Sequence, residues 1–235
     1  MLVEDKCILI LVITRFYSGL QRCLPGFMEM PQQYDFALRK QPRQARSRVT
    51  FDALVEACTR LLGEMGYQAV TTNHVAERAG VAIASLYEYF PHKDAIVAQV
   101  AERLVLRVME QLTLAVPEVL TQAPDKAVHH WIQTIYAVLS QERELLQVFY
   151  YEVPYTNQLP VVRGIVPRLI EFSRQMRDQA GQKVAMQHQE ASLYLIVNLV
   201  SNSIIQMILD PPADIDRDEI LQVLSVRIQS WIAGH

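Results

Sequence analysis

Apolar side chains recur every three or four residues along most of the chain, which is the spacing of helices that bury one side. The first stripe runs from Val49 to Met65, and the next residue, Gly66, favours the left-handed stop of a helix. No segment of any length alternates apolar and polar residues as a strand would, so the pattern predicts an all-α protein. After residue 92, helix breaks are expected at Pro117, Pro124, Pro154, Pro160, Pro167, Gly181, Pro211 and Pro212.

Two further helices in this first region are expected to be short and sharply bounded. One starts after Thr71 or Thr72, both good N-cap residues, and ends at Gly80. The next runs from about Ile83 to Phe90 and stops before a proline, because proline disfavours helical geometry in the residue ahead of it. Three helices of these lengths predict a helix-turn-helix domain over residues 46–94.

The last two predicted helices carry apolar surfaces that need a partner. Residues 191–209 are apolar nearly all round, apart from a polar ladder at four-residue spacing, which argues against a membrane helix. The ladder consists of Tyr194, Asn198, Asn202 and Gln206. Asp216 to Glu219 are typical of the cap that opens a final helix with one apolar face. We therefore expect a homodimer, with an interface formed by Val197, Val200, Ile204, Ile208, Leu224, Ile228 and Trp231.

Charge is divided unevenly along the chain. The net charge is −3, whereas residues 36–95 hold eight Lys or Arg against six Asp or Glu. Within that region the basic arm, Arg39 to Thr50, has no acidic residue. Such arms typically contact DNA phosphates or the minor groove, although a solvated tail is the alternative. We expect residues 1–45 to be a poorly ordered extension that carries this arm, with translation starting at Met28 or Met30.

The N-terminal region does not predict export or a membrane span. Its longest apolar run, Cys7 to Ile13, has seven residues, against roughly 20 for a membrane span. Glu4 and Asp5 stand where a secretory signal should be positive. The three cysteines are widely spaced without a CxxC pair, which suits a reducing compartment. We expect a cytoplasmic protein with no membrane partner.

The second and third helices also carry a family resemblance. The residues at fixed offsets are Thr71-Thr72, Val75-Ala76, Ala79-Gly80-Val81, Ser85-Leu86-Tyr87 and Tyr89-Phe90-Pro91-His92-Lys93. They resemble the N-terminal DNA-binding domain of the tetracycline-repressor (TetR) family, and the likeness runs from about Arg46 to Val100. The resemblance implies an all-helical homodimer, with a helix-turn-helix domain followed by a helical ligand-binding and dimerisation domain over residues 95–235.

The resemblance also implies what such a protein does. It is expected to be a DNA-binding transcriptional regulator, a repressor that leaves a palindrome-like double-stranded DNA operator when a small-molecule effector binds. An activator with the same fold, or a helical interaction protein that has lost DNA binding, are the alternatives. The sequence identifies neither the effector nor the operator.

By the resemblance, Ile83, Ala84 and Ser85 face base edges in the major groove, while Tyr87 and Lys93 face the sugar-phosphate backbone. The base-facing side chains are mostly apolar, which favours contact with thymine methyl groups over bidentate hydrogen bonds. Together with the basic arm, the expected DNA-binding residues are Arg43, Arg46, Arg48, Thr72, Asn73, Ile83, Ala84, Ser85, Tyr87, Tyr89 and Lys93. For Tyr89 the alternative is that its ring packs against the first helix.

The rest of the chain offers candidate ligand contacts but no ligand motif. Ligand sites are usually apolar cavities with a few oriented polar groups. Candidate lining residues are His130, Trp131, Tyr150, Tyr151, Asn198 and Asn202. They could instead belong to the core, and the two asparagines could hydrogen-bond across a dimer. There is no GxGxxG, GxSxG, HExxH or P-loop pattern, and residues 214–219 fail as a calcium loop, so we expect no enzyme, cofactor or metal.

Overall fold

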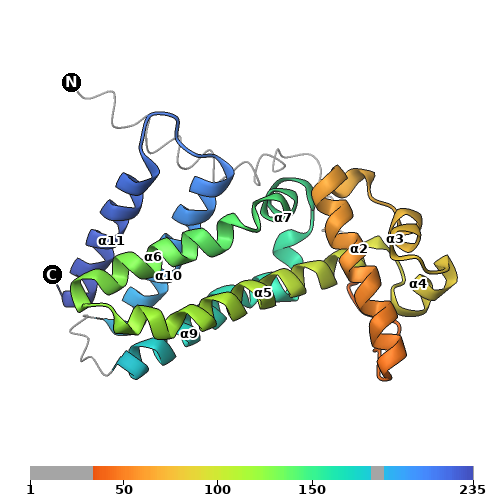
Figure 1. The fold of residues 1–235 in the computed structure, drawn as a ribbon, viewed down its shortest axis with the longest axis horizontal. Helices are drawn as coiled ribbons and strands as arrows, with labels where there is room; N and C mark the ends of the chain where they lie inside the picture. Colours follow the sequence, from red (N-terminus) through yellow and green to blue (C-terminus); the bar gives the residue numbers. More distant parts are fainter. Residues whose placement is uncertain (1–33, 181–187, 235) are drawn as a thin grey trace, which may run out of the picture. The chain divides into compact units, whose positions relative to one another are not determined.

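The computed structural model describes residues 34–180 and 188–234, and every regular element in these ranges is a helix (Figure 1). This confirms the all-α class. The predicted N-terminal extension up to residue 33, and with it the expected translation start, lies outside the described residues. Residues 35–235 form one unit.

The first three described helices form the predicted helix-turn-helix. They are α2 (Ala45–Ala69), α3 (Thr72–Ala79) and α4 (Ile83–Tyr89). Near its end α2 is interrupted at Gly66, whose φ of 75° and ψ of 168° are accessible essentially to glycine alone. Helix α3 opens on the Thr71 hydroxyl, which accepts from the His74 backbone N–H at 3.2 Å. It ends at Gly80 in the predicted left-handed conformation, with φ 67° and ψ 30°.

An aromatic core holds these three helices together. Phe90, at the end of α4, is fully buried, and its ring stacks on Phe51 of α2 with 4.9 Å between centroids. Leu86, one turn earlier in α4, is also fully buried. Tyr89 packs edge-on against the Phe51 ring, with 5.8 Å between centroids. The inward side of α4 is therefore formed by its C-terminal half, and the start of the helix is left outside the core.

Helix α5 (Lys93–Thr121) joins the helix-turn-helix to the body. Residues 95–98 are buried and pack against α2, while later turns pack against α6. A single continuous helix therefore belongs to both predicted domains.

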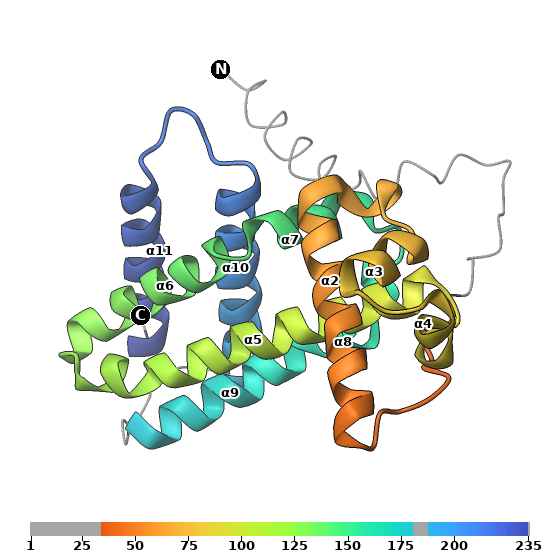
Figure 2. The same ribbon diagram turned by 45° about the vertical axis from the view of Figure 1, so that its right-hand side comes forward.

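The body contains the remaining elements. In chain order they are α6 (Pro124–Ser140), α7 (Arg143–Gln147), the π-helical turn η2 (Val148–Glu152), the 3₁₀ turn η3 (Thr156–Gln158), α8 (Pro160–Arg163), α9 (Ile165–Ala180), α10 (Gln189–Leu209) and α11 (Arg217–Ala233). Figure 2 shows α5 and α9 running side by side away from the helix-turn-helix. The predicted cap of α11 is confirmed, because the Asp216 carboxylate accepts from the backbone N–H groups of Asp218 and Glu219 at 2.8 and 3.1 Å.

Of four predicted proline breaks, two coincide with the start of a helix and two fall inside a helix. Pro124 and Pro160 each open a helix, where the missing N–H is not needed. The breaks expected at Pro117 and Pro167 are wrong, because both residues lie inside helices. Pro167 is in the first turn of α9, where no N–H partner is lost. At Pro117 the helix loses one hydrogen bond, which the burial of neighbouring apolar residues on α5 outweighs.

Helices α6, α10 and α11 share the main apolar core of the body. Its buried members are Ile132, Val200, Ile204, Met207, Ile208, Leu221, Leu224 and Ile228. This corrects the predicted dimer interface, since six of its seven residues are at most 9% exposed within the single chain. The six are Val197, Val200, Ile204, Ile208, Leu224 and Ile228. Helix α6 packs against the side of α10 and α11 that carries these residues. Of the predicted set, only Trp231 is exposed.

Helix α10 is the one described helix that is long and apolar enough to cross a bilayer, with 21 residues and a mean hydropathy of 1.6. It packs against α6, α9 and α11, so its inner side belongs to the core. Two residues of the polar ladder bond to the helix itself, whereas the Gln206 amide donates to the Tyr150 hydroxyl of η2 at 2.7 Å. The side-chain amides of Asn198 and Asn202 donate to the carbonyls of Tyr194 and Asn198, each at 2.8 Å.

Candidate nucleic-acid interface and internal cavity

Helix α4 is the predicted reading helix, the one expected to face base edges in the major groove, and its start presents a small apolar surface. Ile83 and Ala84 are exposed and Ser85 is half-buried. No side chain caps the helix, because the N-cap residue is Ala82. An isoleucine that remains 38% exposed on such a short helix contributes little to the core, but it can contact thymine methyl groups in a major groove. The structure thus leaves the three predicted base-facing residues accessible.

Two predicted backbone contacts lie together. The hydroxyl oxygens of Thr72 and Tyr87 are 3.0 Å apart, so one donates to the other. The second hydroxyl keeps a free proton, which can be donated to a phosphate oxygen. Asn73 is the exposed residue after Thr72 on α3. Sequence reasoning treated Thr72 and Tyr87 as separate contacts, whereas the structure makes them one donor pair.

Part of the basic arm is tied to the reading helix. The backbone N–H of Arg39 donates to the Tyr89 carbonyl at 2.9 Å, and its guanidinium donates to the Tyr87 carbonyl at 3.1 Å. These carbonyls lie at the C-terminal end of α4, where helices leave acceptors without internal partners. Lys40 forms an exposed ion pair with Glu88, at 3.9 Å. At these positions the arm makes specific contacts and is not a solvated tail.

Three arginines of the basic arm are available for phosphate. Arg43, Arg46 and Arg48 are exposed and form no ion pair with the described residues. Arg46 and Arg48 lie in the first turn of α2, which contains no acidic residue. Cations at a helix N-terminus are unfavourable by roughly 0.3–1 kcal/mol each. A bound phosphate would favour both the arginines and the free N–H groups of that turn.

Two of the predicted DNA contacts are engaged inside the protein. Tyr89 is only 5% exposed, so its assignment to the DNA-facing set is corrected, because the ring belongs to the core. The ammonium of Lys93 donates to the Tyr67 carbonyl at 2.9 Å and lies 3.9 Å from the centroid of the Tyr67 ring. Its predicted contact with phosphate stays a prediction.

Lys93 belongs to a polar cluster that connects the helix-turn-helix with the body. Tyr67 and Tyr155 both donate their hydroxyl protons to Oδ1 of Asp94, each at 2.8 Å. The Glu152 carboxylate accepts from the backbone N–H of Tyr67 at 2.7 Å. Tyr155 is fully buried, and burial together with the Asp94 charge raises the pKa of its hydroxyl, which therefore stays a donor. We call these five residues the junction cluster.

The junction depends on a glycine. A Cβ at Gly66 would lie 2.5 Å from Oε2 of Glu152, so only a residue without a side chain allows this approach. Glu152 is the last residue of η2, and π-helical turns occur frequently at functional sites. The junction cluster was not foreseen from the sequence, because Tyr67 and Glu152 are 85 residues apart.

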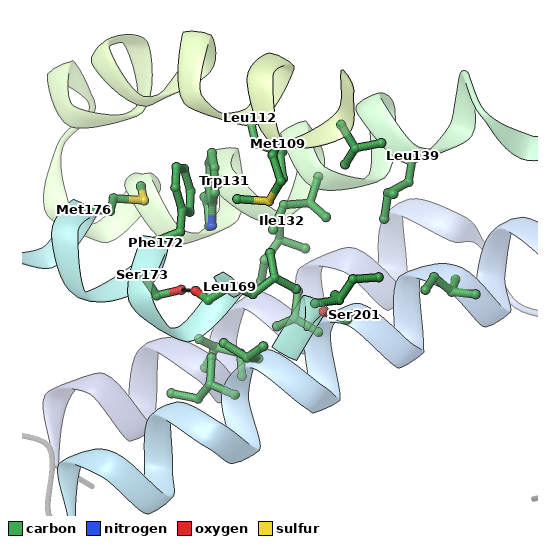
Figure 3. Close-up of a pocket in the computed structure, with 18 of the residues that line it drawn as sticks. Met109, Leu112, Trp131, Ile132, Leu139, Leu169, Phe172, Ser173, Met176 and Ser201 are labelled. Atoms are coloured by element: carbon green, nitrogen blue, oxygen red, sulfur yellow. Dashed lines mark hydrogen bonds between the residues drawn. The ribbon is translucent and has the colours of Figure 1, made fainter. Parts of the chain in front are cut away.

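The body contains an apolar cavity of about 830 Å³ (Figure 3). This volume lies within the roughly 300–1,000 Å³ of small-molecule sites. In Figure 3 the rings of Trp131 and Phe172 stand beside each other, and their centroids are 5.9 Å apart. Met109 and Met176 flank this pair. The cavity is large enough for a small molecule and offers it mainly apolar contacts.

The wall of the cavity and the junction cluster share an element. Phe149 and Tyr150 of η2 line the cavity, and Glu152 of the same turn holds the Tyr67 backbone N–H. The Thr156 hydroxyl, also at the wall, donates to the Phe149 carbonyl at 2.6 Å. A displacement of η2 from the cavity side would therefore act directly on α2.

Of the six predicted ligand residues, Trp131 and Tyr150 line the cavity. The prediction is corrected for the other four, which do not line it: His130, Tyr151, Asn198 and Asn202. The α10 residues that line the cavity include Val197 and Ser201. Asn198 and Asn202 each follow one of these two, a rotation of about 100° around the helix. Phe172 and Met176 were missed, because a cavity wall and a core have the same sequence pattern.

A short exposed reading helix, a basic arm and an all-helical body with a cavity define a helix-turn-helix DNA-binding regulator. Residues 54–100 match the family model for bacterial regulatory proteins of the tetR family. This domain is a tetR-family DNA-binding domain, as the resemblance predicted. A comparison with curated proteins found no match.

Solved structures of tetR-family regulators share the fold. A protein from Mesorhizobium loti MAFF303099 assigned to this family is 13% identical over 81% of this chain and 98% of its own, with a TM-score of 0.61. The fatty acid degradation regulator FadR from Bacillus halodurans is 12% identical over 83% and 100%, with a TM-score of 0.56. A TetR transcriptional regulator from Rhodococcus sp. RHA1 is 21% identical over 78% and 97%, with a TM-score of 0.53. The described chain therefore has the fold of tetR-family transcriptional regulators.

Proposed function

We propose that the protein is a cytoplasmic, homodimeric transcriptional repressor that leaves a palindrome-like operator when a small molecule fills the body cavity. The observation that carries DNA binding is the exposed apolar start of the reading helix, Ile83 and Ala84. The Thr72–Tyr87 donor pair and the basic-arm arginines that form no ion pair with the described residues add phosphate contacts. The tetR-family match of the same domain supports it.

The mode of recognition follows from the reading helix. Residues 81–90 contain no Arg, Lys, Asn or Gln, so strong bidentate bonds to guanine or adenine are not available from it. Specificity then rests on thymine methyl groups, Ser85, Asn73 and the shape of the site. Affinity rests on phosphate contacts from the basic arm. We expect an operator that tolerates substitutions at several positions.

Release by a small molecule is supported by the shared role of η2. A ligand that fills the cavity contacts Phe149, and the same turn ends in Glu152, which holds the Tyr67 backbone N–H. Tyr67 lies in the last turn of α2, which belongs to the helix-turn-helix domain. Filling the cavity would shift the orientation of that domain, provided the ligand prefers the shifted state.

The outer side of α10 and α11 supports a homodimer. Its large apolar side chains are 41–54% exposed: Leu195, Leu199, Val223, Val226 and Trp231. Leu199 and Trp231 line a common hollow, so the exposed sides of the two helices adjoin. A contiguous apolar surface is unusual on a monomer and marks an interaction site. Helix-turn-helix proteins that read two half-sites do so as dimers, so a second copy of the chain is the partner that fits this surface. This surface replaces the interface predicted from the sequence.

A binding selection with the purified full chain and random duplex DNA tests the proposal. We expect enrichment of an inverted repeat whose half-site centres are one helical turn apart, about 34–36 Å. Failure to enrich any inverted repeat at moderate salt would overturn DNA recognition by this chain.

One variant and its control test whether Ile83 contributes to sequence preference and not to general DNA affinity. Ile83→Ala should relax the preference for thymine at the positions it faces without changing the salt dependence of binding. Arg174→Ala, on the exposed surface of the body, is the matched control and should change neither. A selected site that is identical for Ile83→Ala and the unaltered protein would contradict the assignment of α4 as the reading helix.

A further inference from the structure

The wall of the cavity carries a single charge. Among the described residues that line it, Arg177 is the one ionised side chain, and neither Asp nor Glu is among them. A cationic ligand would be removed from water without a counter-ion, which is strongly unfavourable. An anionic head group could instead pair with the guanidinium, which offers several donors in a planar fork.

The cavity is elongated. Its wall runs along α5 from Ala101 to Gln122, the residue that caps the end of this helix, and this stretch spans about 30 Å at about 1.5 Å per residue. Phe149 of η2 lines the end near the junction cluster. At the opposite end the wall includes Gln122, Arg177 and Gln229, which come from the last turns or ends of α5, α9 and α11. Figures 1 and 2 both show the ends of these three helices together.

Between its ends the cavity offers few hydrogen bonds. The wall there is formed by side chains such as Met109, Leu112 and Trp131. The Ser173 hydroxyl already donates to the Leu169 carbonyl at 2.8 Å (Figure 3). A polar group in the middle of a ligand would lose its bonds to water with little compensation. Ser201 adds a second hydroxyl to this stretch of the wall, so the middle of the ligand must be largely apolar.

We propose that the cavity binds an anionic amphiphile with one long alkyl chain, with its head group at Arg177 and its tail directed toward η2. Arg177 now pairs with the adjacent Asp178, at 3.1 Å, and that carboxylate is 70% exposed, so water can replace it as the partner. At this end of the cavity the negative C-terminal ends of α5, α9 and α11 meet the positive N-terminal ends of α6 and α10. These helix dipoles offset one another, so they do not repel an anionic head group. The binding site is the cavity of the proposed function, so this proposal about the ligand rests on that function.

The orientation has a regulatory consequence. A long tail reaches Phe149 and the wall of η2, whereas a short tail bound at Arg177 stops before it. Only chains above a threshold length then disturb the bond between Glu152 and Tyr67. Short-chain carboxylates should bind without releasing DNA, and long-chain carboxylates should do both.

Binding can be measured by tryptophan fluorescence. The chain has two tryptophans, of which Trp131 lines the cavity and Trp231 does not, so Trp231→Phe leaves one reporter at the site. The probes are tetradecanoate, tetradecanol and tetradecyltrimethylammonium, each below its micellar concentration. We expect the carboxylate to bind at least about tenfold more tightly than the ammonium, the equivalent of one charge-assisted hydrogen bond. Equal or tighter binding of the ammonium, or no response to any probe, would overturn the ligand class.

Two arginine variants test the orientation. Arg177→Gln should weaken tetradecanoate binding by about tenfold or more and leave tetradecanol binding unchanged. Arg174→Gln is the matched control, because Arg174 lies on the same helix and pairs with Glu171 and Glu190 without lining the cavity. Equal losses for both probes in Arg177→Gln, with an unchanged melting temperature, would place the head group elsewhere and overturn the orientation.

The last step uses the operator from the binding selection. Fluorescence anisotropy of labelled operator is followed while octanoate, dodecanoate or hexadecanoate is added to the full-length protein. Release that appears only with the longer chains supports the proposal, and release independent of length contradicts it. If carboxylates bind and the protein holds the operator at every length, the release step of the proposed function fails while the ligand class stands.

Discussion

At Gly66 the junction has no room for a methyl group. The substitution Gly66→Ala combines an unfavourable backbone conformation, costing about 1–3 kcal/mol, with displacement of the Glu152 carboxylate from the Tyr67 N–H. We expect it to lower the free energy of unfolding by roughly 2–4 kcal/mol, measured by urea denaturation.

Gly80→Ala is the control for this loss. Gly80 also has a positive φ, of 67°, but nothing lies within 4 Å of a Cβ placed there. Only the backbone term applies, so a loss of about 1 kcal/mol is expected. In a Glu152→Ala background the loss caused by Gly66→Ala should shrink, because the clash is removed. Equal losses at the two glycines would contradict the role of Glu152.

Cys58 offers a test of burial in the same domain. It is fully buried, and this burial raises the pKa of its thiol to about 12. With Cys7 and Cys23 replaced by serine, the native protein at pH 8 should react with a thiol reagent far more slowly than the protein unfolded in urea, because the thiolate is the reactive form. Equal rates would contradict the burial.

The raised pKa also gives a sign to the pH dependence of stability. A group whose folded pKa lies above its unfolded value, about 8.5 for cysteine, stabilises the fold below that value. Its contribution is lost as the pH rises toward about 12. Between these limits the free energy of unfolding should fall more steeply than in a Cys58→Ala variant, measured by denaturation at a series of pH values.

At the scale of the element, local signals determined what could be predicted. The ends of α3 and α4 follow from Gly80 and Pro91, because each residue restricts the backbone of its own position or its neighbour's. The partner of a helix side could not be predicted in the same way. Val200 and Ile204 show that a helix has an apolar side, but the same pattern is compatible with burial by α6 or by a second subunit.

The same distinction between local signals and long-range contacts applies to the candidate site. The accessible residues at the start of α4 could be identified from a motif within a short stretch of sequence. The junction cluster and the cavity could not, since Glu152 and Tyr67 have no local signal that relates them. Cavity residues such as Phe172 differ from core residues only in what the rest of the fold leaves empty beside them.

The basic arm should affect DNA affinity and protein stability in opposite directions. Arg46→Ala and Arg48→Ala should each reduce the slope of log affinity against log salt by about 0.9, the loss of one phosphate contact. Each should leave the free energy of unfolding unchanged or raise it by up to about 1 kcal/mol, because a cation leaves a helix N-terminus. Anisotropy titrations at several salt concentrations and urea denaturation measure the two quantities.

The matched control for the arm is Arg60→Ala. Arg60 lies in the middle of α2 and pairs with Glu56 at 3.0 Å, away from the first turn. Its removal should leave the salt slope unchanged. A loss of slope equal to that of Arg46→Ala would mean that overall charge, and not the position of the arm, determines the effect.

At the scale of the whole molecule, the exposed sides of α10 and α11 should hold two subunits together. Leu199→Asp and Val226→Asp place charges within this surface, so we expect each to shift the protein from dimer to monomer in sedimentation velocity experiments. Operator affinity should fall as the dimer is lost, because two reading helices bind one palindrome-like site.

Leu114→Asp is the control for the dimer variants. Leu114 is 73% exposed on α5, away from the last two helices, and its substitution should leave the dimer intact. The melting transition of each variant shows whether the subunit still folds. A protein that remains dimeric with either charge in α10 or α11 would contradict this interface.

The uncapped start of the reading helix has one more consequence. Helix α4 has only seven residues, lacks a side-chain cap and is anchored through its C-terminal half, at Leu86, Tyr89 and Phe90. Helices this short are unstable by themselves, and a missing cap removes about 1 kcal/mol more. The amide protons of its first turn should therefore exchange rapidly with solvent in the free protein and become protected on the operator. A mismatched site would then leave this turn frayed, so that discrimination between DNA sequences includes whether the helix completes its own folding.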